Sequence, residues 1–151
     1  MSDTVFALLI LIKDDYLLLP NAAAAEVAGL ENFEARARDA QKWIAGWYSS
    51  AERRIPVLSF EALAGGRCAE PGKRGRIVII NPLGQRMASG GFAILAQDQP
   101  HLVSLTKASV SPSKLRDADS DELVLSRVRV NDKDAIIPDL EHIEAQLSGL
   151  A

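Results

Sequence analysis

Short apolar segments, each bounded by residues that favour turns, recur along most of this chain. The segments are Val5–Ile12, Tyr16–Leu19, Ile55–Phe60, Arg76–Ile80, Gly91–Ala96, Leu102–Leu105, Leu123–Val130 and Ala135–Ile137. Asn81–Gly84 and Asn131–Asp134 are the clearest hairpin turns between them. Regular short runs with turn signals between them are typical of an all-β barrel or sandwich. The sequence therefore predicts an all-β fold with only short helices.

The first apolar segment, VFALLILI, lies close to the N-terminus and is followed directly by Lys13-Asp14-Asp15. Eight apolar residues are too few to span a bilayer. The segment also lacks the basic flank and the small-residue cleavage site of a secretory signal. We therefore expect Val5–Ile12 to be a buried strand that forms a hairpin with Tyr16–Leu19, and we expect no insertion into a membrane.

Two segments between the second and third runs favour helix. The alanines of Ala22–Leu30 predict a short helical or irregular turn, and Glu34-Ala-Arg-Ala-Arg predicts helix within Phe33–Trp43. Near the C-terminus, the three-and-four spacing of apolar residues in Leu140–Leu147 predicts an amphipathic helix that ends near Gly149 and caps one end of the β structure.

The apolar alternation in Leu123–Val130 slips once along the segment. A strand that keeps one face buried cannot change its period without an extra residue. We therefore expect a β-bulge within this strand, or a change in the layer that it faces.

Length and charge restrict the class of protein. A chain of 151 residues fits one domain, residues 1–151, and a formal charge of −3 provides no general field for nucleic acid. The single cysteine, Cys68, cannot form an intramolecular disulfide, so a reducing compartment, the cytoplasm, is expected. No nucleic-acid partner is predicted.

The stretches that could form a phosphate-binding or metal-binding site lack the residues or the spacing that such sites need. Gly66–Arg74 has five residues between its glycines where a phosphate-binding loop needs four, and Arg74 replaces the magnesium-binding hydroxyl. His101 and His142 are the only histidines and lack a paired metal-ligand motif. Asp117–Glu122 lacks the glycine and the closing glutamate of a calcium loop. We predict no catalytic residues, no metal and no cofactor.

The stretch GWYSSAERRIPVLSF carries the most specific pattern of the chain. Gly46 is followed, after nine residues, by Pro56-Val57, and this spacing resembles that of CheW-like chemotaxis adaptors. In that family a strand that opens with glycine leads through an Arg-Gly turn to a strand with Pro-Val and an Asp-Leu end. The resemblance covers nearly the whole chain, including Glu26-Val27, where the family often has Glu-Ile, and the strand after Gly90-Gly91.

This chain departs from the family pattern at the turn. Ala51-Glu52 stands where the family has Arg-Gly, and Ser59-Phe60 stands where it has Asp-Leu. The sequence most resembles the divergent CheW-like proteins of type IV pilus chemosensory systems, the ChpC group, which act in twitching motility.

The resemblance implies a fold of two intertwined five-stranded β-barrels of the SH3 type. It also implies a non-catalytic adaptor of a two-component system, which couples the tip of a methyl-accepting chemotaxis-type receptor to the regulatory domain of a CheA-type histidine kinase. Function then lies in surfaces, where exposed aromatic and arginine side chains carry most of the binding energy. The residues expected to contact partners are Glu26, Val27, Trp47, Tyr48, Ala51, Glu52, Arg53 and Arg54.

Within this set, strand alternation places Trp47 and Tyr48 on opposite faces, so at most one of them packs in the core. The other, with Arg53 or Arg54, is the candidate contact residue.

The residues alone, without the family resemblance, leave two other functions open. The first is a small β-barrel enzyme or accessory domain in which Cys68, His101 and scattered carboxylates converge. The second is a nucleic-acid-binding barrel. Its candidate cations are Arg53, Arg54, Arg67, Lys73, Arg74 and Arg76.

Overall fold

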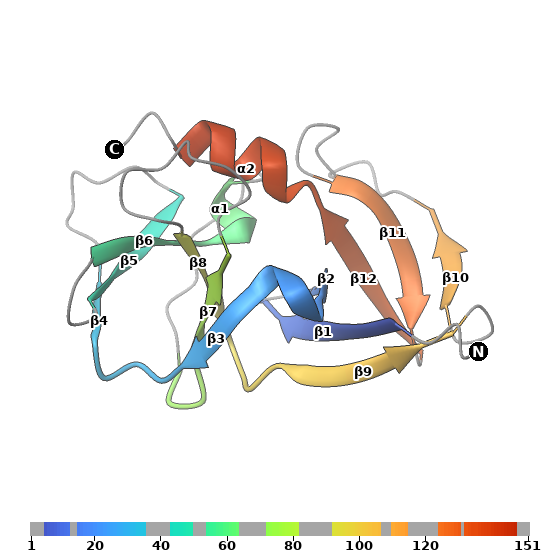
Figure 1. Ribbon diagram of the computed structural model, residues 1–151, viewed down its shortest axis with the longest axis horizontal. Coiled ribbons are helices and arrows are strands. Elements are labelled where there is room, and N and C mark those ends of the chain that lie inside the picture. The colour runs from blue at the N-terminus through green and yellow to red at the C-terminus, as the bar shows by residue number, and fades with distance from the viewer. Residues whose placement is uncertain are drawn as a thin grey trace.

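In a computed structural model, the chain forms two curled β-sheets with short helices, which confirms the predicted all-β class (Figure 1). The structure describes residues 5–12, 15–35, 43–49, 54–63, 72–81, 92–106, 110–114, 124–130 and 132–147.

The first sheet contains six strands in the order β10-β11-β12-β2-β1-β9 among the described residues. Their bounds are β1 (Val5–Leu11), β2 (Tyr16–Pro20), β9 (His101–Leu105), β10 (Val110–Ser113), β11 (Val124–Val130) and β12 (Lys133–Pro138). The strands β1 and β2 form the predicted N-terminal hairpin, with Leu9 opposite Leu18.

The second sheet has the order β3-β7-β8-β6-β5-β4 within the same described part. Its strands are β3 (Ala24–Ala28), β4 (Phe33–Ala35), β5 (Ile44–Ser49), β6 (Arg54–Leu58), β7 (Arg76–Ile80) and β8 (Phe92–Ala96). The middle of the chain thus builds one sheet, whereas both ends of the chain build the other. Each sheet contains one parallel pair, β2 with β12 and β6 with β8.

Strand β1 shows why the first apolar run is continuous. Ala7 and Leu9 point into a cluster enclosed by the first sheet, whereas Leu8 and Ile10 point into a second cluster between the two sheets. Successive side chains of a strand face opposite sides, so a strand that is buried on both faces needs apolar residues at every position.

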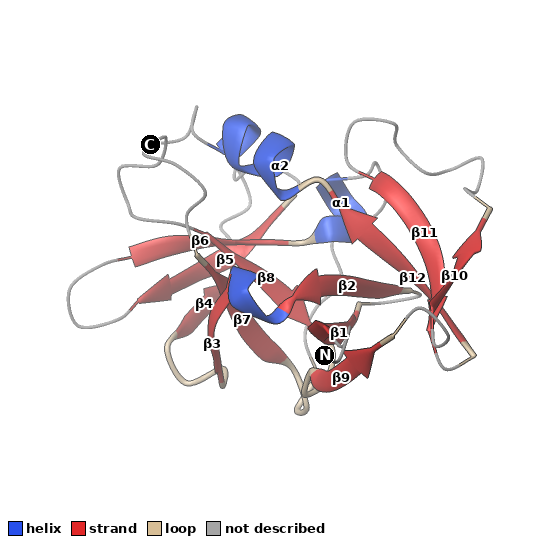
Figure 2. Ribbon diagram, turned by 45° about the vertical axis from the view of Figure 1, so that its right-hand side comes forward, coloured by secondary structure: helices blue, strands red, loops and turns tan. Residues whose placement is uncertain are grey.

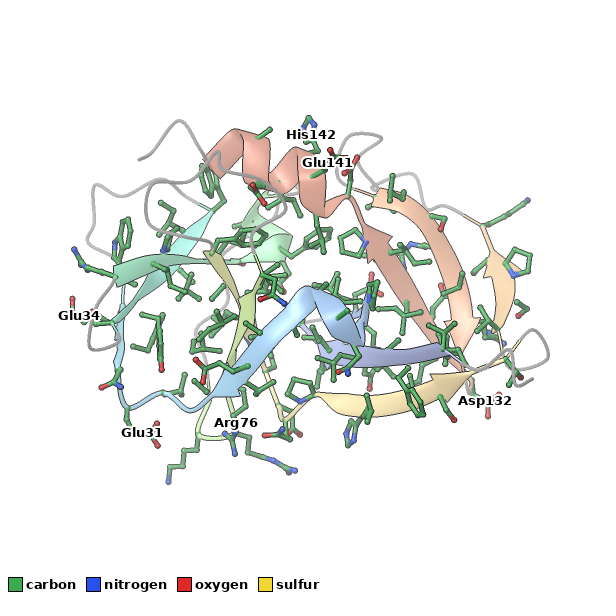
Figure 3. The ribbon with its side chains drawn as sticks, in the orientation of Figure 1. Glu31, Glu34, Arg76, Asp132, Glu141 and His142 are labelled. Carbon is green, nitrogen blue, oxygen red and sulfur yellow. The ribbon has the colours of Figure 1, made fainter. Side chains whose placement is uncertain are left out.

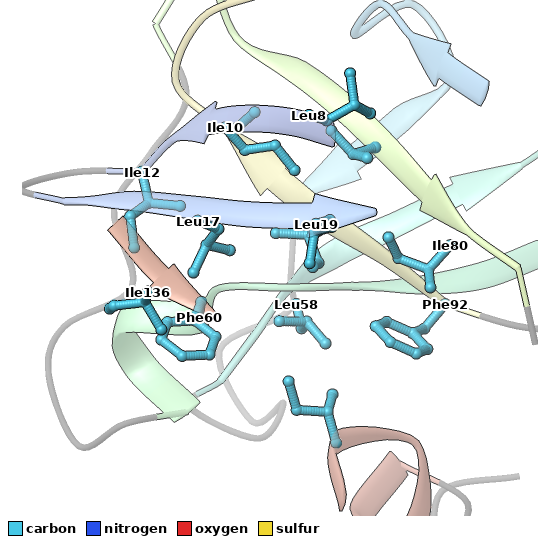
Figure 4. Packing of buried hydrophobic residues seen from close by; sticks show 14 of the residues in the cluster. Leu8, Ile10, Ile12, Leu17, Leu19, Leu58, Phe60, Ile80, Phe92 and Ile136 are labelled. Atoms are coloured by element: carbon cyan, nitrogen blue, oxygen red, sulfur yellow. The ribbon is translucent and has the colours of Figure 1, made fainter. Parts of the chain in front are cut away.

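The cluster between the sheets holds the two layers together (Figure 4). Its buried members are Leu8, Ile10, Ile12, Leu17, Leu19, Leu58, Phe60, Val78, Ile80, Phe92, Ile94, Ala96, Val124, Ile136 and Ile143. The strands of both sheets and both α-helices contribute to it. Full burial of each Leu, Ile or Phe side chain contributes about 1.5–3 kcal/mol, so this shared core fixes the two sheets against each other.

Two short α-helices contribute Phe60 and Ile143 to the shared core. The helix α2 (Leu140–Leu147) begins after Asp139, whose Oδ1 accepts a hydrogen bond from the backbone N–H of His142 at 3.1 Å. Figure 2 shows α2 across one end of the two sheets, where its Ile143 is fully buried. The predicted C-terminal helix is thereby confirmed.

The predicted Ile55–Phe60 strand is wrong at its last two residues, because β6 ends at Leu58 and the helix α1 (Phe60–Leu63) begins after Ser59. Ser59 explains the change, because its Oγ accepts a hydrogen bond from the N–H of Ala62 at 3.3 Å and so caps the helix.

The helical predictions for Ala22–Leu30 and Phe33–Trp43 are wrong where the structure describes them. Only Asn21–Ala23 forms a 3₁₀ turn (η1), and Ala24–Ala28 and Phe33–Ala35 are strands. Pairing with neighbouring strands outweighs the local preference of alanine and glutamate for helix, because tertiary context overrides propensity. The prediction that all of Val5–Ile12 is buried is also wrong at its start, since Val5 and Phe6 are exposed.

The predicted bulge lies in β11. The register with β12 shifts between Val124 and Ser126, which leaves Leu125 as the extra residue. In the turn that follows β11, Asp132 has a φ of 67°, a conformation that aspartate tolerates better than most residues. The hairpin β7–β8 has the expected antiparallel pairing, although Asn81 alone of its predicted turn lies within the described residues.

A buried ion network holds the first sheet together. Arg127 in β11 has a side chain only 2% exposed and binds both carboxylate oxygens of Asp15, at 3.2 and 2.7 Å. Asp134 lies 3.8 Å from the same guanidinium and accepts a hydrogen bond from the hydroxyl of Ser113. The network therefore links the start of β2 to strands β10, β11 and β12.

Candidate docking surface

Strand β5 places its two aromatic residues on opposite faces, as the alternation predicted. Tyr48 lies opposite Phe33 and Ile55, and it packs against the cluster inside the second sheet. Trp47 lies opposite Glu34 and Pro56, on the outer face. The structure thus decides that Tyr48 is a packing residue and that Trp47 is the candidate contact.

Trp47 forms a compact group with one cation and one anion. The guanidinium carbon of Arg54 lies 4.7 Å from the centroid of the Trp47 ring, within cation–π distance. The same guanidinium lies 3.3 Å from the carboxylate of Glu34, which Figure 3 shows on β4 at the border of the molecule. We call Glu34, Trp47 and Arg54 the aromatic–arginine cluster.

The cluster is accessible to a partner. The side chains of Arg54 and Glu34 are 56% and 69% exposed, so the ion pair contributes only about 0–1 kcal/mol to stability. Its contacts nevertheless reduce the number of conformations that the arginine samples. A held, exposed arginine above a tryptophan is the type of anchor that protein interfaces use, because little side-chain entropy is lost on binding.

Gly46 allows the strand that carries Glu34 to lie against β5. A Cβ atom at Gly46 would overlap the backbone oxygen of Glu34 and would lie 2.6 Å from Cε1 of Phe33. The glycine that marks the sequence pattern is therefore explained by close packing of two strands. It indirectly places Glu34 beside Arg54.

The other predicted contact residues do not all join this cluster. Glu26 and Val27 lie on β3, at the opposite edge of the second sheet, with β7, β8 and β6 between them and Trp47. Glu26 is exposed, whereas Val27 packs against the shared core. Ala51, Glu52 and Arg53 lie outside the described residues.

Sequence reasoning missed Glu34. Because Phe33–Trp43 was interpreted as helical, the short strand in which Phe33 is half-buried and Glu34 is exposed was not recognised. The tripeptide Phe33-Glu34-Ala35 is too short to separate a strand from a helical turn by periodicity alone. The pairing with β5 is needed to identify it.

The basic segment Gly72–Arg76 forms a tight turn with a hydrogen bond from Gly75 N–H to Gly72 O at 3.0 Å. Arg74 pairs with Asp98 at 3.3 Å, and Arg76 donates to Gln99 at 3.1 Å. The turn borders an open hollow of about 560 Å³ lined by Gly29, Leu30, Glu31, Lys73, Gly75 and Arg76. Its cations are mixed with anions, in contrast to the continuous basic stripe expected of a nucleic-acid-binding surface.

The structure describes only some of the residues that the enzyme alternative named. His101 is exposed at the start of β9, whereas His142 lies on α2, and Cys68 lies outside the described part. The described residues also contain no group of three or more His, Cys, Asp or Glu side chains that could hold a metal ion. Among the helices that the structure describes, none has the length and apolar character needed to cross a membrane.

Comparison with known proteins places this geometry in a family. The model of the CheW-like domain matches residues 7–147. The fold is similar to that of the scaffolding protein TtCheW from Thermoanaerobacter tengcongensis, with a TM-score of 0.69 and 18% sequence identity over 89% of this chain and 88% of that chain. No curated protein matches the sequence with significant similarity.

The family match covers both sheets, the shared core and the strands that carry the aromatic–arginine cluster. Proteins of this family are non-catalytic scaffolds, which removes the enzyme alternative. The chain therefore belongs to the CheW-like domain family and is a scaffold adaptor of chemotaxis-type signalling.

Proposed function

We propose that this protein couples the cytoplasmic tip of a chemoreceptor to the regulatory domain of a CheA-type histidine kinase. The observation that carries the proposal is the family match over residues 7–147. The protein acts in the cytoplasm as a single domain of two β-barrel lobes, in which each curled sheet forms one lobe.

The aromatic–arginine cluster is the contact that we assign to one of these two partners. Tryptophan and arginine are enriched among the residues that dominate interface energies. Arg54 offers guanidinium donors to a carboxylate or a backbone carbonyl, and Trp47 offers an apolar ring beside it. The partner surface should therefore combine an apolar side chain with an acidic group.

Calorimetry with purified partners tests this assignment. Trp47→Ala and Arg54→Gln should each weaken binding to one partner by at least about tenfold, which corresponds to 1.4 kcal/mol. Arg129→Gln, an exposed arginine of β11 in the other sheet, is the matched control and should leave both affinities unchanged. If all three variants bind both partners as tightly as the wild type, the cluster is not part of the interface. A wild-type protein that binds neither partner would refute the proposed function.

Glu26 and Val27 form a second proposed contact, on the other edge of the same sheet. Glu26 is exposed and is available to a cation of a partner. Glu26→Gln should weaken binding to the partner that the aromatic–arginine cluster does not contact. If Glu26→Gln weakens binding to the same partner as Trp47→Ala and Arg54→Gln, the two edges belong to one interface.

The turn at Ala51-Glu52 is proposed to select the partner. Ala51 lacks the charge of the family's arginine, and Glu52 adds an anion where the family has glycine. Glu52 should repel the standard receptor or kinase, because electrostatic complementarity mainly sets specificity and association rate. Ala51→Arg combined with Glu52→Gly should gain affinity for a standard CheA regulatory domain and lose affinity for the native partner. Unchanged affinities in a folded double variant would show that the turn does not set specificity.

The resemblance to adaptors of type IV pilus systems supports a role in twitching motility. Deletion of the gene should then reduce twitching but not flagellar swimming. Complementation with the Trp47→Ala variant should fail if its docking surface is required. A swimming defect with normal twitching would assign the protein to a flagellar system instead.

A further inference from the structure

Strand β9 is an edge strand with an open side. It pairs with β1 along its full length, from Val5 opposite Leu105 to Leu9 opposite His101. The described residues place no strand on its other side. Figures 1 and 2 both show β9 along the lower border of the molecule. Within the described part of the chain, its outer backbone groups are therefore available for pairing with another strand.

The four edge strands of the two sheets differ in how they avoid such pairing. Strand β3 carries the exposed Glu26, β4 is only three residues long and carries Glu34, and β10 contains Pro112, which cannot donate a hydrogen bond. Charges, short length and proline are the usual protections of edge strands. Strand β9, with the sequence HLVSL, carries no proline and no acidic, lysine or arginine residue.

Exposed apolar side chains gather beside the same edge. Within the described residues, the large hydrophobic side chains that are exposed are those of Val5, Phe6, Leu102 and Leu125, and three of the four lie on β1 or β9. Phe6 is 55% and Leu102 is 59% exposed. Phe6 lies opposite Ser104, so Leu102 is its diagonal neighbour on one face of the sheet.

We propose that β9 pairs in antiparallel fashion with β9 of a second copy of this chain. A two-fold axis at Val103, the middle residue of the strand, would pair all five residues, with Leu102 opposite Ser104 of the second copy. The cross-strand row would then run from Phe6 through Ser104 to Leu102 of the second copy. Because serine is small, it leaves the aromatic ring and the leucine free to touch above it.

The chemistry of the strand favours a second copy over a different protein. A two-fold pair brings each side chain of the strand against another side chain of the same strand. The absence of acidic, lysine and arginine residues in β9 means that the two copies carry no fixed like charges to repel each other. The same arrangement at β4 would place a Glu34 carboxylate close to its own copy. Such an isologous contact also closes on itself and does not continue into a fibre.

Sedimentation over a concentration series tests the proposal with the full chain. The wild-type protein should show a reversible monomer–dimer equilibrium. Leu102→Lys should abolish the dimer, because it removes the apolar contact with Phe6 of the second copy and places two new cations diagonally across the two-fold contact. Leu125→Lys is the matched control, since Leu125 is 62% exposed but lies on β11, and its dimer should persist. A wild-type monomer throughout, or a dimer that survives Leu102→Lys, overturns the proposal.

Cross-linking tests the register independently of affinity. In a Cys68→Ser background, a mixture of Leu102→Cys and Ser104→Cys chains oxidised with glutathione disulfide should form a disulfide-linked dimer. Directly opposed residues of antiparallel strands come close enough for such a bond. Leu102→Cys alone should cross-link much more slowly. Equal rates in both samples would overturn the proposed pairing.

Discussion

The buried ion network offers the sharpest test of how the first sheet is stabilised. Arg127 is only 2% exposed on its side chain, and Asp15 is 13% exposed. Two hydrogen bonds of 3.2 and 2.7 Å join them, which is the paired geometry that favours an arginine–carboxylate contact. Removal of Arg127 would leave the Asp15 carboxylate, which is 13% exposed, without its cation.

We expect Arg127→Met to destabilise the protein by about 3–5 kcal/mol. For a chain of this size each kcal/mol lowers the melting temperature by about 2–4 °C, so the melting temperature should fall by roughly 6–20 °C. The double variant Arg127→Met with Asp15→Leu should recover part of this loss, because an apolar pair replaces two of the three charges, while Asp134, 24% exposed, loses its contact with the guanidinium. Urea denaturation of the wild type, the two single variants Arg127→Met and Asp15→Leu, and the double variant gives the coupling free energy directly.

An exposed pair in the same molecule supplies the control. Glu34 pairs with Arg54 at 3.3 Å, but both side chains are more than half exposed. Glu34→Gln should therefore cost only about 0–1 kcal/mol, whereas Asp15→Asn should cost several times more. Similar losses for the two variants, or an Arg127→Met protein as stable as the wild type, would refute the reasoning that burial decides the strength of the network.

Three further predictions concern the core, the close strand contact and the absence of catalysis. Ile79→Ala should destabilise the protein by about 2–5 kcal/mol, because Ile79 is only 2% exposed, and an unchanged urea midpoint would contradict its assignment to the core. Gly46→Ala should cost about 1–3 kcal/mol through overlap with β4, whereas Gly72→Ala, which has no atom within 4 Å of the added Cβ, should leave the thermal melt almost unchanged. A Cys68→Ala, His101→Ala double variant should keep its partner affinity in calorimetry, since the adaptor uses no thiol or imidazole chemistry, and lost binding by a folded variant would reopen the question.

The sequence by itself determined the strand character of most of the chain and the amphipathic C-terminal helix. Both follow from periodicity, which is a local property: Leu140–Leu147 repeats at helical spacing, and the slip within Leu123–Val130 requires an extra residue. The spacing of Gly46 and Pro56, together with the order of the strands, indicated the family. It spans the β5–β6 pair, in which Gly46 lies opposite Val57, and Gly46 itself is needed where β4 packs against β5.

Only the tertiary structure decided which aromatic residue of β5 packs against the enclosed cluster and which lies on the outer face. Trp47 and Tyr48 are adjacent and chemically similar, and their different positions follow from which side of β5 faces the enclosed cluster. The strands β3 and β4 could not be predicted from the sequence either, because their alanine and glutamate residues favour helix locally. These segments are strands because they pair with β7 and β5. Arg127 and Asp15 are 112 residues apart in sequence, and no local pattern predicts that the fold buries them together. Long-range pairing thus fixes the surfaces of this protein and the strands β3 and β4, whereas local periodicity fixes most of the other strands and the C-terminal helix.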